Sequence, residues 1–136
     1  MVWYEQPPAP HNERRDGHRL LDSVPVRHKL AELKIEFAVG RLLSYRIAWM
    51  QGHGLVPNAE ASIGKLFSTE LQSRFAVAAM GLLGPAGMLS RSSARVPADG
   101  RFSSYYLAAV SYTIAAGTSE VQRNIIAQRG LALPRT

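Results

Sequence analysis

The feature that most restricts the fold of this chain is a pair of long segments with helical periodicity and no internal proline. In the first, residues 26–50, apolar and small side chains recur near a heptad seam at Leu30, Leu33, Phe37, Gly40 and Ile47. In the second, with Asn58 as a plausible N-cap, they recur at Ile63, Phe67, Leu71, Phe75 and Leu82. Glycine and proline separate the two segments at Gly52, Gly54 and Pro57, which predicts a turn between two antiparallel helices.

The first segment also carries a second apolar ridge, so we expect its helix to be contacted from two sides. That ridge consists of Ile35, Ala38, Leu42, Tyr45 and Trp49. Basic residues seven positions apart, Arg27, Lys34 and Arg41, indicate the solvent-exposed face.

The glycine-rich run Gly84 to Gly87 ends the second helix, and a shorter helix is predicted over residues 102–113. Its aromatic and apolar run consists of Tyr105, Tyr106, Leu107, Val110, Tyr112 and Ile114. Two interpretations are open: the run packs in the core, which is the more common outcome, or it forms the wall of a binding site.

The tail of the chain turns sharply at Gly117 and then enters a last helix. Ser119 followed by Gln122 three residues later fits a capping box. Glu120 falls in the first turn, where the helix dipole favours a carboxylate, and Gly130 is expected to end the helix as a left-handed C′ residue. The spacing alone indicates a capped helix, although a glycine turn before free N–H groups would also suit a phosphate.

These elements predict an all-α, up-and-down helical bundle over residues 24–136, preceded by a polar and irregular lead-in over residues 1–23. No strand pair with a hairpin signal and no internal repeat is evident.

Composition excludes several classes of function. The 136 residues contain no cysteine, which excludes a disulfide framework, a thiolate metal site and a cysteine nucleophile, and mildly favours the cytoplasm. The net charge of +6 comes from scattered arginines without a basic, aromatic-interleaved stripe, so nucleic-acid binding is not expected. The longest apolar run, residues 75–89, is too short and too rich in glycine to span a bilayer, and no secretory signal opens the chain. His53 has no second ligand at usable spacing, so we expect no metal site.

Three stretches of the sequence closely resemble one family. Residues 116–135, Ala-Gly-Thr-Ser-Glu-Val-Gln-Arg-Asn-Ile-Ile-Ala-Gln-Arg-Gly-Leu-Ala-Leu-Pro-Arg, resemble the C-terminal signature of the acyl-CoA dehydrogenases, flavoenzymes that desaturate acyl thioesters. Residues 28–49 are similar to that family's "KLA…AR.L.YRAA" helix, and residues 61–67 to its "A(S/A)MAKL" pattern. Together the stretches cover residues 24–135 in family order, as in the C-terminal helical domain of these enzymes.

The resemblance implies a cofactor, FAD, and a substrate, an acyl-CoA thioester. It places Thr118, Ser119 and Glu120 against the cofactor and Gly117 beside the thioester. A glycine loop that meets the flavin of a neighbouring subunit corresponds to residues 81–87, where Gly84 and Gly87 are retained while Gly81 replaces a glutamine and Pro85 a glycine. A homo- or hetero-oligomer of dehydrogenase subunits is therefore expected.

The main departure from the family is chemical. Many members carry the catalytic glutamate immediately before the glycine of the signature, and this chain has Ala116 there. Glu5 and Glu13 are poor substitutes, and the N-terminal helical and middle β-domains of the family have no counterpart in these residues. Two hypotheses follow: the C-terminal domain of an FAD-dependent dehydrogenase of fatty-acid or related lipid β-oxidation, inactive as a lone chain, or a non-catalytic oligomerisation module or remnant.

Overall fold

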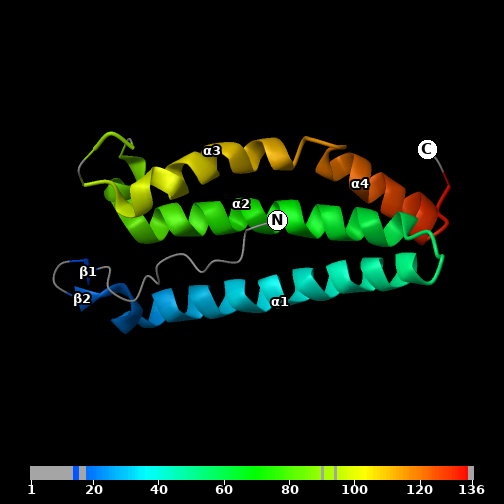
Figure 1. Cartoon of the computed structure of the whole chain (residues 1–136), viewed down its shortest axis with the longest axis horizontal. Coiled ribbons are helices and arrows are strands. Elements are labelled where there is room, and N and C mark those ends of the chain that lie inside the picture. Colours follow the sequence, from blue (N-terminus) through cyan, green and yellow to red (C-terminus); the bar gives the residue numbers. More distant parts are fainter. Residues whose placement is uncertain (1–13, 16–17, 90, 94, 135–136) are drawn as a thin grey trace.

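Four α-helices in three layers make up the described part of the chain. The computed structural model describes residues 14–15, 18–89, 91–93 and 95–134. Helix α1 spans Val24–Gly52, α2 Asn58–Leu83, α3 Arg101–Tyr112 and α4 Ser119–Ile125. Figure 1 shows α2 between two layers, with α1 on one side and α3 followed by α4 on the other. The all-α bundle predicted from the sequence is thereby confirmed.

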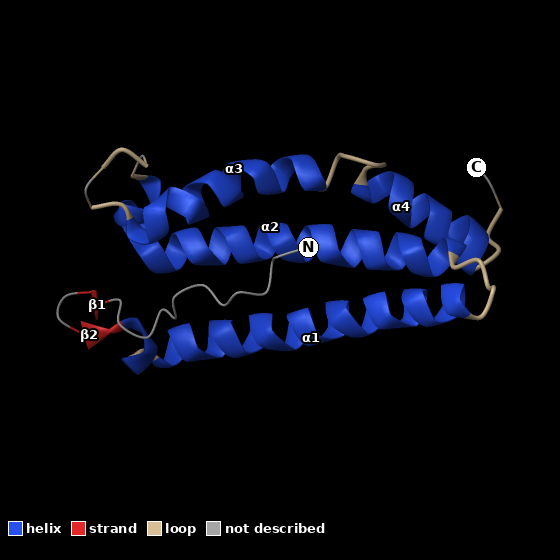
Figure 2. Ribbon diagram, viewed as in Figure 1, coloured by secondary structure: helices blue, strands red, loops and turns tan. Residues whose placement is uncertain are grey.

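Short helical turns connect or extend these helices. They are 3-10 turns at Leu20–Asp22 and Gly84–Met88, a turn at Pro97–Gly100 in which Ala98 and Asp99 have left-handed backbone angles, and a π-helical turn at Ile126–Gly130. Figure 2 shows how little of the described chain lies outside helices.

One short antiparallel strand pair precedes α1, and the sequence analysis missed it. Strand β1 is Arg14–Arg15 and β2 is His18–Arg19, with Arg14 paired to Arg19. In the sequence, Asp-Gly separates the two strands, and this dipeptide is typical of two-residue hairpin loops. A pair this short does not change the fold class.

Helix α2 is the centre of the packing, because α1 lies on one side of it and α3 and α4 lie on the other. The ring of Phe75 lies 5.7 Å from that of Phe37 on α1, and 5.8 Å from that of Tyr105 on α3, both edge-to-face. Phe102 of α3 lies 6.4 Å away, centroid to centroid. Edge-to-face aromatic pairs are worth about 0.5–1.5 kcal/mol beyond the area that they bury, so this cluster joins all three layers.

Small residues let α1 and α2 approach closely along the predicted seam. A Cβ on Gly64 would lie 2.8 Å from Cδ1 of Ile47, and one on Gly40 would lie 3.5 Å from the Phe67 ring. Leu33 of the same seam is buried. Ion pairs flank the contact, with Arg74 of α2 3.1 Å from Glu36 of α1.

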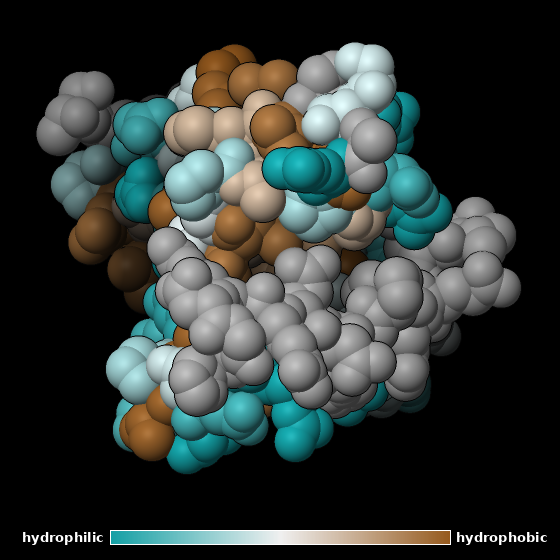
Figure 3. All heavy atoms as spheres, turned by 90° about the vertical axis from the view of Figure 1, so that its left-hand side faces the viewer, coloured by the Kyte–Doolittle hydropathy of each residue, from teal (hydrophilic) through white to brown (hydrophobic). Residues whose placement is uncertain are grey.

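The second ridge of α1 has no helix packed along it within the described chain, contrary to the expectation of contact from two sides. Only α2 packs extensively along α1, on the opposite face. The large ridge side chains remain 58–66% exposed: Ile35, Leu42, Tyr45 and Trp49. Viewed from the end of the bundle where α1 begins, hydrophobic side chains also reach the outer surface among hydrophilic ones (Figure 3). An exposed apolar ridge of this kind is typical of a surface that contacts another protein surface.

Two predicted helix ends differ in detail. Pro57, not Asn58, is the N-cap of α2, and the Asn58 side chain instead accepts a hydrogen bond from Arg129 at 3.4 Å. Gly130 is not left-handed; it lies in the π-helical turn, where a Cβ would come within 3.2 Å of the Ala59 Cβ. The glycine is thus explained by close approach to α2, and the positive φ falls on Ala132.

The buried centre of α2 gives a direct test of this packing. Leu71 is 3% exposed, so we expect Leu71→Ala to lower the free energy of unfolding by about 2–4 kcal/mol through lost burial and a residual cavity. Leu107→Ala, at a side chain 74% exposed, should change it by less than about 0.5 kcal/mol. Urea denaturation followed by circular dichroism measures both, and equal losses would contradict the assigned core.

Candidate functional site

The segment between α3 and α4 forms a turn with two consecutive residues in the left-handed region. Ala116 has φ +56° and Gly117 φ +94°, after which Thr118 returns to an extended conformation. A non-glycine residue held in this region costs about 1 kcal/mol or more and persists only where its surroundings impose it. The contacts that hold the turn are therefore of interest.

Side-chain donors from two elements hold the carbonyls of this turn. The buried Gln122 of α4 donates from Nε2 to the carbonyl oxygens of Ala116 at 3.1 Å and Gly117 at 3.5 Å. Lys65 of α2 donates from Nζ to the carbonyl oxygen of Gly117 at 2.6 Å. The turn is thus tied to its own helix and to the central helix at once.

The N-terminus of α4 is capped by Thr118, one residue earlier than predicted. The Thr118 Oγ1 accepts a hydrogen bond from the Val121 amide at 3.3 Å, whereas Ser119 is the first helical residue and is buried. The predicted capping box of Ser119 with Gln122 is therefore wrong. Gln122 reaches past the cap to the carbonyls of the turn, because the left-handed pair directs those carbonyls toward it.

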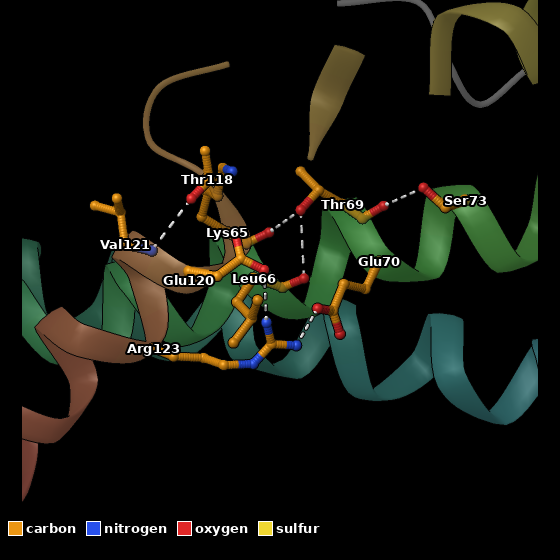
Figure 4. A network of polar contacts seen from close by, with 9 residues as sticks. All are labelled: Lys65, Leu66, Thr69, Glu70, Ser73, Thr118, Glu120, Val121 and Arg123. Atoms are coloured by element: carbon orange, nitrogen blue, oxygen red, sulfur yellow. Dashed lines mark hydrogen bonds and ion pairs between the residues drawn. The ribbon is translucent and has the colours of Figure 1, made fainter. Parts of the chain in front are cut away.

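A second link from α4 to α2 runs through charge (Figure 4). Arg123 forms an ion pair with Glu70 of α2, and its other terminal nitrogen lies 3.7 Å from Glu120. The Glu120 backbone N–H, the Thr118 hydroxyl and the Arg123 charge hold the pKa of Glu120 below its ordinary value. Its contribution to stability is therefore present above that ordinary value and is lost as the pH falls through the lowered pKa.

The structure brings together one part of the predicted cofactor site but not the other. Gly117, Thr118, Ser119 and Glu120 are contiguous beside the first turns of α2, whereas Gly84 follows the last turn of α2. At about 1.5 Å per residue, Lys65 and Gly84 are roughly 28 Å apart along that helix. Residues from the two ends of α2 within one chain therefore cannot contact the same part of a ligand.

Gly84 and Gly87 form a tight end to α2. Gly84 has φ +58°, a conformation that favours glycine, and Gly87 is buried. A Cβ on Gly87 would lie 3.0 Å from the Leu83 Cβ. Both glycines thus have a local structural reason to be present.

The position before Gly117 offers no proton acceptor. Ala116 is exposed and carries no titratable group, and the carboxylates of Glu70 and Glu120 both face Arg123. Glu5 and Glu13 lie outside the described residues.

His53 and the aromatic run of α3 have structural roles in the described chain. The Nδ1 of His53 lies 2.8 Å from the Trp49 carbonyl oxygen, and the two rings are 4.4 Å apart. The described residues contain no cluster of three or more metal-ligating side chains, and no described helix is long and apolar enough to cross a bilayer. Tyr105 packs against Phe75 in the core, but the opposite face of the α3 run is exposed at Leu107, Val110 and Ile114.

Comparison with known proteins gives consistent results. Residues 10–131 match the family model described as "Acyl-CoA dehydrogenase, C-terminal domain". The acyl-CoA dehydrogenase FadE26 of Mycobacterium tuberculosis is 36% identical over 88% of this chain, which spans only 30% of that protein. A chain of the ChsE4–ChsE5 complex from the same organism superposes with a TM-score of 0.84 at 34% identity, over 93% of this chain and 32% of that one. The FAD complex of PigA shares the fold, with a TM-score of 0.76 at 22% identity over 91% of this chain and 30% of that one.

The strained turn predicts an unequal response to two glycine substitutions. Gly117→Ala places a Cβ 2.8 Å from the Gln122 Nε2 at φ +94°, and we expect it to lower the free energy of unfolding by about 1–3 kcal/mol. Gly52→Ala is the control, because a Cβ there meets no heavy atom within 4 Å, and it should change stability by less than about 1 kcal/mol. Thermal unfolding compares the two variants, and an unperturbed Gly117→Ala protein would contradict the turn geometry.

Proposed function

The chain belongs to the acyl-CoA dehydrogenase family, as its C-terminal domain, and on that premise we propose that it supplies one helical layer of an FAD-dependent enzyme that desaturates acyl-CoA thioesters. The observation that carries this proposal is the turn at Gly117, at the position of the family signature, which Lys65 ties to α2 and Gln122 ties to α4. The chain spans about 30% of the length of the relatives that it matches, so the activity concerns a larger assembly. We place that assembly in fatty-acid or related lipid β-oxidation in the cytoplasm.

The described residues fit a polar cofactor at this turn. Thr118 and the exposed Glu120 side chain offer oxygen atoms there, whereas Ser119 is buried. The absence of a side chain at Gly117 lets the Gln122 amide pack against the turn, since a Cβ there would lie 2.8 Å from the Gln122 Nε2, and we propose that the acyl thioester lies beside this turn. FAD, when bound, would accept the hydride from the substrate.

A complete site would need a second subunit. The half-site at Gly117 lies beside Lys65 in the first third of α2, and the half-site at Gly84 and Gly87 follows the end of that helix, so one flavin touching both kinds of residue would draw them from two chains. The related ChsE4–ChsE5 structure is a complex of two proteins. We propose a homo- or hetero-oligomer of dehydrogenase subunits, with the exposed ridge of α1 among the covered surfaces.

Proton abstraction would come from outside the Gly117 turn. Removing the proton next to a thioester needs a positioned base, and Ala116 has no titratable side chain. We propose that the lone chain does not turn over acyl-CoA and that other parts of the assembly supply the base. The exposed apolar faces and Ala116 equally motivate the second candidate, a non-catalytic oligomerisation module or remnant.

Retention of FAD separates these two functions. After incubation with FAD and removal of free cofactor, we expect the purified chain mixed with a dehydrogenase chain that carries the other two domains to keep a visible flavin absorbance band. The same mixture with Gly117→Ala should keep less, while Gly52→Ala should match the wild type. A colourless mixture would contradict the dehydrogenase proposal and favour the non-catalytic module.

The proposal that the exposed ridge of α1 is covered in an oligomer leads to a separate prediction. We expect light scattering after size exclusion to give the wild-type chain a mass at least twice the 14.9 kDa of a single chain. Leu42→Glu, which places a charge at the centre of the exposed ridge, should shift it toward the single-chain mass, because a desolvated, unpaired carboxylate is costly.

Gln51→Glu is the matched control for that variant. It adds the same charge near the end of α1, away from the apolar ridge, and should leave the mass unchanged. A wild-type chain that is monomeric at micromolar concentration would contradict self-association through this ridge.

A further inference from the structure

We propose that Lys65 is a positioning residue, which sets the conformation of the turn at Ala116 and Gly117 by holding the Gly117 carbonyl against α2. Its Nζ lies 2.6 Å from that carbonyl oxygen, across 52 residues of sequence. The inference deepens the proposed function, on which its ligand-binding part rests, because Gly117 is the residue assigned there to the thioester.

The lysine is not engaged by any carboxylate among the residues that the structure describes. Two carboxylates of α2 are paired with arginines: Glu70 forms an ion pair with Arg123, and Glu60 lies 3.6 Å from Arg46 of α1. The half-buried Lys65 side chain therefore directs its charge to the Gly117 carbonyl. Hydrogen bonds with a charged donor are roughly twice as strong as neutral ones.

The second donor to the turn is Gln122, which lies on α4, the helix that directly follows the turn. Its bonds to Ala116 and Gly117 therefore form only when the chain has already turned. Lys65 lies on α2, in the central layer. Of these two donors, only Lys65 joins the turn itself to α2, whereas the Arg123–Glu70 ion pair joins α2 to the helix that follows the turn.

A rigid turn matters because its conformation is strained. Ala116 has φ +56° without the freedom of glycine, so the turn would relax toward ordinary backbone angles if its carbonyls were released. Loss of the Lys65 bond is thus expected to change the local geometry of Gly117 while leaving the helices in place.

The carbonyl carbon of Gly117 reports on this bond directly in isotope-labelled protein. In Lys65→Met, which keeps most of the aliphatic stem, we expect the Gly117 carbonyl ¹³C resonance to move upfield and the Val121 amide to exchange with solvent roughly tenfold faster. Lys65→Arg retains a cationic donor and should restore most of both signals.

Two controls separate positioning from general stability. Lys34→Met removes an exposed lysine on α1 and should leave the Gly117 resonance unchanged. Leu71→Ala destabilises the core without touching the turn, and it too should leave that resonance in place. An unshifted Gly117 carbonyl in Lys65→Met, with helicity intact, would overturn the proposal.

The wild-type chain provides a measurement that does not depend on any variant folding. The chain has three lysines, and the ammonium protons of Lys65 should exchange with water more slowly than those of the exposed Lys34. Equal exchange of the two ammonium groups would also overturn the proposal.

Flavin retention then distinguishes this inference from the function on which it rests. In the FAD assay, Lys65→Met should weaken retention roughly tenfold and Lys65→Arg should largely restore it. If even the wild-type mixture retains no FAD while the carbonyl shift is as expected, the proposed function fails and the positioning role stands. If FAD is retained equally by wild type and Lys65→Met without a carbonyl shift, the positioning role fails and the function stands.

Discussion

The aromatic contact of Phe75 with both neighbouring layers is the interaction on which the rest of this structure depends. Its ring meets Phe37 of α1 on one side and Tyr105 of α3 on the other, so the central helix is the element that the outer layers share. Polar ties repeat the arrangement along α2, with the Glu36 ion pair toward α1 and the Glu70 ion pair toward α4. A helix that joins two layers in this way sets the positions of everything placed on it.

This arrangement explains why a chain with much apolar sequence has a small buried core. In the described residues the buried apolar side chains are Leu33, Leu71, Ala76, Ala79 and Ala109, several of them small. Small residues bring helix backbones close together but remove little apolar area from water. The large side chains of the α1 ridge and of the outer face of α3 consequently point away from the layer, as expected for a domain that is covered by other domains or subunits.

The fold could be predicted from the sequence because helix periodicity depends only on neighbouring residues and here repeats over many turns. The seam through Leu33 and Gly40 lies against α2 as predicted, since a heptad pattern identifies the buried face of a helix whatever lies opposite. The second ridge, correctly read as apolar, has no partner in the described chain, because periodicity cannot say whether the surface that covers a ridge belongs to the same polypeptide.

The resemblance to a family points to the turn at Gly117 as the candidate site, but the contacts of this turn could not be predicted from the sequence. The cap fell on Thr118 rather than Ser119, because the left-handed pair before it, invisible to spacing rules, decides where the helix begins. In the sequence Lys65 is only one residue of the helix motif at residues 61–67, because no local pattern predicts a bond across 52 residues. Gly130 shows the same limit, because its closeness to Ala59 is a tertiary contact.

Hydrogen–deuterium exchange along the wild-type chain tests most directly whether the tail is held on the central helix. If α2 anchors the Gly117 turn, the amides of α2 should exchange most slowly, and those of Val121 and Gln122 should exchange more slowly than those of the segment around Pro97–Gly100. Exchange of Val121 and Gln122 as fast as that of this segment, with α2 protected, would show that the tail is not held on α2 and would contradict the proposed site.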